Sequence, residues 1–348
     1  MKLSRVLIPG VLACAVLSAC ADEAPESPVG ARPVEGATMS AKAAESITID
    51  DGGTVSDLLD GINADLAAKG APLRAFKAEL IVDPKEWDGS STTIFANDRV
   101  RGLSSEWVAG DPRRDGRVGV TYAFDLAGRQ PVVLTPSGTQ RFATFAEVET
   151  QLEEGMTAWR DETCSDASIT RVPVPTGVDP DLLDNLFLGV AEVPGRSYAQ
   201  VSDIVQAGWQ PTAFFTAFAG AAGTGILGVA FTFSFVDDDG ELTDIDGNGK
   251  RDTGLVEIYY TQRYLWTNSG APGLVDFYSI ITHETGHSLG LAHFGKLFVT
   301  RRDIGDGVQL SDIKYAPLAL MNAAYVTGRG EIVGTDRSSF CQIWASKN

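Results

Sequence analysis

The stretch HETGHSLGLAH at residues 283–293 decides how the rest of the chain is interpreted, because it holds all three histidines of a 348-residue protein. His283 and His287 lie four residues apart, so on a helix both imidazole rings leave the same face. His293 lies six residues further on and would point elsewhere if the helix continued. Gly290 can enter the left-handed conformation that ends helices. We therefore expect the helix to stop there and the chain to return His293 to the other two rings.

The residue types in this stretch favour a metal site with one open position. Three imidazoles form the ligand set of a catalytic zinc site, whereas a structural site closes with a fourth protein ligand, usually cysteine. Glu284 follows the first histidine directly and is expected to lie beside the metal. There it is suited to act as the general base on a zinc-bound water. The alternative is a surface helix that carries polar histidines without a metal.

The motif resembles the signature of the metzincin zinc endopeptidases, in which the three histidines bind the zinc. Downstream, residues 319–325 (ALMNAAY) resemble the methionine turn of that family, with Met321 as the methionine. Tyr325 follows four residues later, as in the matrixin branch. The resemblance implies that Met321 forms an apolar floor beneath the metal and that Tyr325 helps to form the wall of the pocket for the residue after the scissile bond. Matrixins usually have a proline where this chain has Ala323, and an ordinary core methionine is the alternative for Met321.

The resemblance also implies an α+β fold for residues 113–348, with a twisted mixed sheet, an active-site helix and the methionine turn. The hydrophobic pattern predicts strands at 118–124, 203–209, 225–233 and 255–260, helices at 145–159 and 336–344, and an active-site helix that starts near Asp276. In metzincins the strand at the position of residues 225–233 forms the upper rim of the cleft and pairs its backbone with an extended substrate. The expected substrate contacts are Leu227, Gly228 and Val229. A buried central strand is the alternative.

Residues 47–112 are expected to form a small α/β unit in front of this catalytic domain. A capping-box pattern begins a helical run that ends at Gly70, and residues 75–82 and 92–96 are strand-like. Three roles are open for the unit: a removable pro-segment, a domain that covers the cleft, or part of the catalytic body. Matrixins often block the zinc with a cysteine of the pro-segment. No cysteine lies between residues 21 and 163, so that device is absent.

The first 20 residues have the features of an export signal, with a positive start, a short apolar run and a Leu17-Ser18-Ala19-Cys20 ending that resembles a bacterial lipobox. This ending predicts a lipidated Cys20 that anchors the chain to a membrane of the bacterial envelope or cell surface. A secretory signal that is cut off nearby is the alternative. Residues 21–46 are rich in Ala, Pro, Glu and Ser and lack aromatic residues, which is typical of a disordered tether.

Cys164 and Cys341 remain after the signal, and we expect them to form one disulfide in an oxidising compartment. Two buried free thiols are the alternative. The formal net charge of −18 argues against nucleic acid or anionic lipid as the main partner. We therefore expect a peptide or protein as the substrate, and nothing in the sequence indicates more than a monomer.

An acidic loop at residues 243–252 (TDIDGNGKRD) predicts a calcium site, because carboxylate and amide oxygens recur at the positions of a calcium-binding loop. The predicted ligands are Asp244, Asp246, Asn248 and Asp252. Gly249 falls at the position of the sharp turn, but Leu255 stands where a standard EF-hand has glutamate. A solvated acidic turn is the alternative. Matrixins hold a second, structural zinc with other histidines, and none remain here, so we expect that site to be missing.

These features predict a zinc-dependent endopeptidase, in which Glu284 takes a proton from a metal-activated water and later gives it to the leaving amine. Two alternatives are open. The chain can be a zinc-binding surface lipoprotein without turnover, although an intact Glu284 argues against that. It can also be a protease that its N-terminal segment holds latent.

Overall fold

The computed structural model describes residues 55–83, 93–95, 105–127, 129–165, 167–183, 196–271, 273–299, 313–325 and 330–345. The expected signal and tether, with Cys20, lie outside these ranges. Within them, none of the helices is long and apolar enough to cross a membrane.

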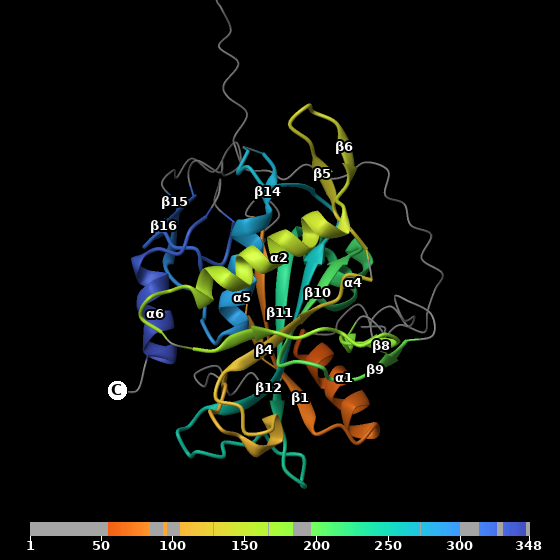
Figure 1. The fold of residues 1–348 in the computed structure, drawn as a ribbon, viewed down its shortest axis with the longest axis vertical. Coiled ribbons are helices and arrows are strands. Elements are labelled where there is room, and N and C mark those ends of the chain that lie inside the picture. Colours follow the sequence, from red (N-terminus) through yellow and green to blue (C-terminus); the bar gives the residue numbers. More distant parts are fainter. Residues whose placement is uncertain are drawn as a thin grey trace, which may run out of the picture.

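A mixed sheet forms the centre of the protein, with its strands in the order β2-β1-β11-β12-β10-β4-β7 (Figure 1). Neighbours from β12 to β7 run parallel, whereas β11 is antiparallel to β12 on one side and to β1 on the other. The strands are β1 (Leu73–Val82), β2 (Thr93–Phe95), β4 (Val120–Phe124), β7 (Ile169–Arg171), β10 (Ile204–Gln210), β11 (Ile226–Phe235) and β12 (Arg251–Thr261), and β3 (Ser105–Glu106) pairs with the start of β12.

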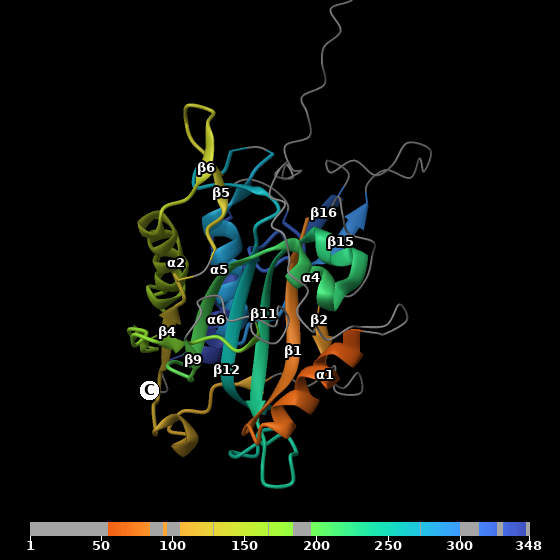
Figure 2. The ribbon, with the colours of Figure 1, turned by 90° about the vertical axis from the view of Figure 1, so that its right-hand side faces the viewer.

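Helices cover both faces of this sheet (Figure 2). On one face lie α2 (Phe145–Arg160), α5 (Phe277–Ser288) and α6 (Gly334–Trp344), and on the other lie α1 (Val55–Ala68) and α4 (Thr212–Ala219). Each face has its own apolar core. The first includes the four buried tryptophans Trp107, Trp159, Trp209 and Trp266, and the second includes Phe214, Phe215 and Phe218 of α4. This arrangement is a mixed α+β fold, in agreement with the predicted class.

Smaller elements complete the described chain. A second sheet has the order β14-β13-β5-β6, and two further strand pairs are β15-β16 and β8-β9. These strands are β5 (Val132–Leu134), β6 (Gln140–Phe142), β8 (Val178–Asp179), β9 (Ser197–Tyr198), β13 (Leu265–Thr267), β14 (Val275–Asp276), β15 (Lys296–Val299) and β16 (Ile313–Ala316), and the 3-10 helices are η2 (Pro112–Arg114) and η3 (Gly220–Gly225).

The position of α5 is fixed from several sides. Its start is set by Asp276, whose side chain accepts a hydrogen bond from the Ser279 amide. Against α2 the packing is so close that a Cβ on Gly155 would lie 2.4 Å from Ile281 Cγ2. Three indole N–H groups from distant parts of the chain also donate to carbonyls at α5 and its C-terminal end. These donors are Trp107 to Ser288 (2.7 Å), Trp159 to Thr282 (2.8 Å) and Trp344 to Leu289 (2.9 Å).

Residues 55–95 are connected to the rest of the protein through the main sheet. β1 pairs with β11 from Leu73, opposite Phe235, to Val82, opposite Ile226. On its outer side β1 pairs with β2. This pairing makes the described part of the segment a strand pair of the main sheet, and the three roles that the sequence leaves open for it stay predictions.

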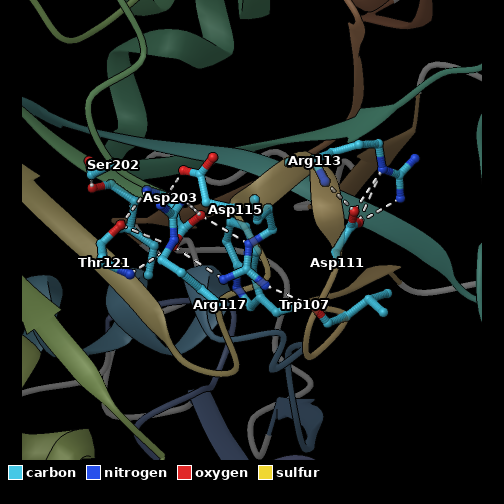
Figure 3. Close-up of polar contacts among 12 residues, drawn as sticks. Trp107, Asp111, Arg113, Asp115, Arg117, Thr121, Ser202 and Asp203 are labelled. Atoms are coloured by element: carbon cyan, nitrogen blue, oxygen red, sulfur yellow. Dashed lines mark hydrogen bonds and ion pairs between the residues drawn. The ribbon is translucent and has the colours of Figure 1, made fainter.

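A buried ion pair ties the segment after β3 to the sheet (Figure 3). Arg114 donates to both carboxylate oxygens of Asp203, at 3.0 and 3.2 Å. Arg117 donates to the same carboxylate, as do the amide and hydroxyl of Thr121. The Arg114 guanidinium also lies over the Trp107 ring. Every donor that surrounds Asp203 therefore has a structural role, because it joins residues 107–121 to the start of β10.

The C-terminal helix α6 is held by a disulfide between Cys164 and Cys341, whose Cα atoms are 5.6 Å apart. This is the pairing that the sequence predicts. Cys164 lies just after α2, so the bridge joins α6 to the helix that packs on α5.

Candidate metal centre

The three histidines converge on one point. The Nε2 atom of His287 lies 3.0 Å from that of His283 and 3.0 Å from that of His293, and the third Nε2–Nε2 distance is 3.3 Å. Three nitrogens bound to one tetrahedral zinc at the usual bond length lie about 3.3–3.4 Å apart. The arrangement therefore fits a single metal ion at the centre of the three rings.

The chain between the histidines folds as the motif predicts. α5 ends at Ser288, and Gly290 has a φ of +91°, which is the left-handed conformation expected for the helix stop. The Gly290 amide donates to the His287 carbonyl and the Leu291 amide to the Gly286 carbonyl. The turn then returns His293 to the face of the helix that carries the other two rings.

Hydrogen bonds on the far side of two rings fix their tautomers for metal binding. His283 Nδ1 lies 2.7 Å from the Leu320 carbonyl, and His287 Nδ1 lies 2.8 Å from the Leu291 carbonyl. A carbonyl can only accept, so each Nδ1 carries the proton and each Nε2 turns a lone pair to the centre. The lone pairs of His283 and His287 therefore face each other, and they repel unless a cation or a donated proton lies between them, which is compatible with a metal.

Burial keeps these histidines neutral. Desolvation lowers the pKa of His283 to about 4 and holds the pKa values of His287 and His293 well below the ordinary 6.5, and the neighbouring rings add to the effect on the last two. Neutral imidazole is the form that binds metals, so all three ligands are in the competent state at neutral pH.

Glu284 follows His283 in α5, and no described side chain donates to its carboxyl group. It is fully buried, and both carboxylate oxygens lack a hydrogen-bond partner among the residues that the structure describes. Burial raises its pKa well above the ordinary 4.5, the Glu79 carboxylate adds to the rise, and the nearby Ile81 amide opposes it. An unpartnered buried carboxyl costs stability. A buried carboxyl in this setting is a candidate for proton transfer.

Met321 packs against the helix that carries the first two histidines. It is fully buried, and a Cβ on Gly286 would lie 2.5 Å from its sulfur, so a larger residue there would displace the methionine side chain. The turn is held by Asp336 of α6, whose carboxylate accepts the amides of Leu320 (3.0 Å) and Met321 (3.1 Å). Asp336 could not be selected from its sequence position, because its partners lie 15 and 16 residues away in an irregular segment.

The expected substrate strand is present, but its rim is not free. Leu227, Gly228 and Val229 lie in β11, and Gly228 is so close to Glu284 that a Cβ there would lie 2.7 Å from Oε1. We expected this backbone to be open to an extended substrate. Instead it is paired on both sides, with β12 and with β1, because Leu80 lies opposite Val229 and Ile81 opposite Gly228. The rim of the expected cleft is therefore occupied by the chain itself.

A pocket of about 330 Å³ lies beside the centre, and the expected wall residue Tyr325 lines it. Leu320, Ala324 and Val333 give it an apolar lining, and Ile81 of β1 closes one side. The Tyr325 hydroxyl accepts from the Asp276 amide (3.3 Å), so this wall is attached to the start of α5.

The acidic loop 243–252 brings three of its four predicted calcium ligands together and turns the fourth away. Asp244 and Asp246 accept hydrogen bonds from the Asn248 amide, and Asp244 also accepts from the Gly249 amide. Asp252 is buried and forms an ion pair with Arg113 at 2.6 Å. Calcium binding therefore stays a prediction, without Asp252 in position to join the other three.

Three site residues were missed by sequence reasoning, and all belong to residues 77–93. Glu79 Oε2 lies 3.4 Å from His287 Nδ1 and 2.6 Å from Lys77 Nζ. Thr93 Oγ1 lies 3.3 Å from His293 Nδ1. The charged residues in KAELIVD were the available signal, because Lys77 and Glu79 are buried in the face of β1 that is turned to α5.

One further acidic group lies away from this centre. Asp125, Asp179 and Asp181 are buried with carboxylate oxygens within 4.8 Å of one another, and Arg196 pairs with Asp125 at 3.0 Å and lies 3.7 Å from Asp179. The arginine compensates part of this negative charge, which is enough to explain the cluster as structural.

Comparison with protein-family models and with curated proteins found no match to this chain. The assignment of the site therefore depends on its own residues and their geometry.

Proposed function

We propose that the protein is a zinc-dependent endopeptidase of the metzincin type. The observation that carries this proposal is the convergence of three Nε2 atoms at 3.0–3.3 Å beside an unpartnered, buried Glu284. Three histidines with one open position favour a catalytic rather than a structural zinc. The residues present fit the ion in number, donor type, tautomer and spacing.

In the proposed reaction the zinc ion and the residues of the chain have different roles. Bound zinc would polarise the scissile carbonyl and lower the pKa of a water in the open position. Glu284 takes the proton from that water and delivers it to the leaving amine, and its raised pKa suits a group that must hold a proton between the two steps. Met321 would form the apolar floor beneath the ion, and the backbone of β11 would offer pairing groups to an extended peptide only where β1 does not already use them.

The sequence supports an exported enzyme that is attached to a membrane through a lipidated Cys20 and acts on peptide or protein substrates. This part of the proposal depends on the lipobox and on the acidic composition alone.

A direct test uses the chain from Ala21 onwards, loaded with zinc and incubated with a mixed peptide library. Cleavage is read by mass spectrometry, with Glu284→Gln as the matched control. Metal content is measured in parallel for the wild type and for His287→Ala. Cuts in the wild type that are absent in Glu284→Gln, together with about one zinc per chain that His287→Ala loses, support the proposal.

The second candidate is a zinc-binding surface protein without turnover. It is favoured by the complete burial of His283 and Glu284, which are 0 % exposed, and of His287, which is 1 % exposed. Stoichiometric zinc without cleavage in any form of the chain would select this candidate.

A further inference from the structure

From the pairing around the metal centre we infer that β1 occupies the substrate cleft as an internal peptide and holds the enzyme latent. This inference rests on the proposed function, because it assigns the cleft and its natural occupant to a peptidase. No cysteine is involved, since the described part of the segment, residues 55–83 and 93–95, contains none.

The first argument is that β1 is held between two rims, as an extended peptide in a cleft would be. On one side it is antiparallel to β11, with Ile81 opposite Gly228. On the other side Val82 forms a parallel bridge with Ala324. The Val82 carbonyl accepts from the Tyr325 amide at 3.0 Å, and the Val82 amide donates to the Ala323 carbonyl at 3.4 Å. The wall of the pocket thus pairs with β1 through its backbone.

The second argument is the position of Ile81. Its side chain lines the same pocket as Tyr325, and its backbone lies opposite Gly228, where an added Cβ would lie 2.7 Å from Glu284 Oε1. Ile81 therefore places its side chain in the pocket while its backbone lies next to the proposed general base, Glu284. A bound peptide must present one side chain in this way if a neighbouring bond is to be cut.

The third argument is that β1 and β2 close access to the histidines. Glu79 lies 3.4 Å from His287 Nδ1, and Thr93 lies 3.3 Å from His293 Nδ1. With both in place His283, His287 and Glu284 are buried and His293 is partly buried, so an external peptide has little access to this group. Figure 2 shows β1 directly beside β11 with α1 outside it, so any movement of β1 from the cleft must involve α1 as well.

The two faces of β1 differ in a way that an ordinary core strand does not require. The face turned to α1 is apolar, with Ala78, Leu80 and Val82 in the second core. The face turned to the metal centre carries the buried charges of Lys77 and Glu79. Lys and Glu are almost never fully buried without a specific reason. Here they lie where the variable side chains of a substrate would lie.

The occupant also indicates the substrate class. The cleft accepts an extended peptide that pairs with both rims and places an aliphatic side chain of the size of isoleucine at the pocket. External substrates should therefore be unfolded or loop segments with an apolar residue at that position.

The test compares two matched truncations in the zinc-loaded chain from Ala21 onwards. Ile81→Ala weakens the hold of β1 on the pocket, and Ile204→Ala removes the same atoms from a buried site in β10, two strands away from β11. We expect Ile81→Ala to raise the rate of peptide cleavage at least about tenfold over the wild type, because the loss of these contacts favours the open state. Ile204→Ala should leave the rate unchanged while it lowers stability by a similar amount.

A second experiment measures peptide binding to the cleft and does not depend on catalytic turnover. The probe is a fluorescent peptide with the sequence of residues 77–83, KAELIVD, and its anisotropy is followed in a Glu284→Gln background. The peptide should bind the chain that also carries Ile81→Ala and should not bind the chain with Ile81 intact. The control peptide KAELDVD should bind neither.

The outcomes separate the two levels of the proposal. Equal cleavage by the wild type and Ile81→Ala would overturn latency and leave the peptidase assignment intact. Peptide binding to the opened chain without cleavage by any variant would contradict the proposed function but support β1 as the occupant of the cleft. Failure of the peptide to bind the opened chain, with cleavage unchanged, would overturn the inference.

Discussion

Asp203 and Glu284 are both carboxylates with 0 % exposure, yet their surroundings are opposite. Asp203 accepts from two arginines and from the amide and hydroxyl of Thr121, whereas Glu284 has no hydrogen-bond partner among the described residues. Burial tends to raise the pKa of Asp203, but Arg114 and the Thr121 amide outweigh it and lower the pKa below 3.8. Burial raises the pKa of Glu284 well above 4.5.

The difference shows how to distinguish a carboxylate that stabilises the fold from one that is available for a reaction. A carboxylate that is surrounded by donors fixes the fold, and it cannot take up a proton without breaking those bonds. A carboxyl that lies next to metal ligands and has no donors gains nothing for the fold but is available for proton transfer. The predictions below test this distinction, from the largest expected effect to the smallest.

Glu284→Gln should lower kcat/KM for peptide hydrolysis by about 10²–10⁴-fold, because general acid–base catalysis is lost. The free energy of unfolding should stay the same or rise, since an ionisable group without partners leaves the core. Steady-state kinetics and urea denaturation measure the two effects. A clear loss of stability would mean that Glu284, like Asp203, is structural.

Asp203→Asn should lower the free energy of unfolding by about 3–5 kcal/mol, because it leaves the Arg114 guanidinium buried without its counter-charge. Asp115→Asn is the matched control. Asp115 is also bonded to Arg117, but its side chain is 87 % exposed, so a change below about 1 kcal/mol is expected. Urea denaturation followed by tryptophan fluorescence compares the two. Similar values for both variants would contradict the structural role of Asp203.

Glu257 is an intermediate case that makes the comparison sharper. It accepts from the Leu182 amide (2.7 Å) and the Tyr259 hydroxyl (2.9 Å), but burial still raises its pKa to about 8, with Asp179 adding to the rise. The folded state therefore holds a proton between pH 4.5 and 8 that the unfolded state has released.

Stability should accordingly be full below about pH 4.5 and should fall by up to about 1.4 kcal/mol per pH unit until pH 8. Glu257→Gln should remove this slope relative to the wild type. Urea denaturation at pH 5, 6, 7 and 8 measures the difference between the two curves. Parallel curves would show that Glu257 is ionised in the folded protein.

Glu147 is a carboxylate with several donors that lies at the surface, where solvent weakens ion pairs. It accepts from Arg141 and from the Thr144 amide in the capping box of α2, and these bonds lower its pKa to about 2. Glu147→Gln should cost about 0.5–1 kcal/mol at pH 7 after solvent screening. The stabilising effect is present above pH 4.5 and is lost as the pH falls through 2, so thermal melts of the two chains should converge at low pH.

The local parts of the site could be predicted from the sequence. The spacing of His283, His287 and His293 with Gly290 depends on helix geometry alone, and the structure reproduces it. The starts of α2 and α5 follow from Thr144 and Asp276 as caps, and β1, β2, β4, β10, β11 and β12 match the predicted strands, whereas the remaining strands were not predicted. These features need no knowledge of distant residues.

The pairing of β1 with β11 could not be predicted, because Leu80 and Val229 are far apart in sequence and no local pattern encodes their register. Lys77 and Glu79 also suggest a solvated face when the strand is considered alone. The orientation of Asp252 depends in the same way on Arg113, which precedes it by 139 residues. Such long-range contacts decide which carboxylates are paired with a positive charge. The sequence therefore predicts the candidate ligands well, but it does not predict the residues that surround them.

The attachment of α6 has a consequence for genetics. Asp336 holds the turn of Met321 by two amides, and Cys341 joins the same helix to the end of α2. A premature stop codon before position 336 would leave HETGHSLGLAH intact in the gene but remove what supports its floor. We therefore expect alleles with a stop codon between positions 326 and 336 to lose metal binding, although the three histidines and Met321 are all retained.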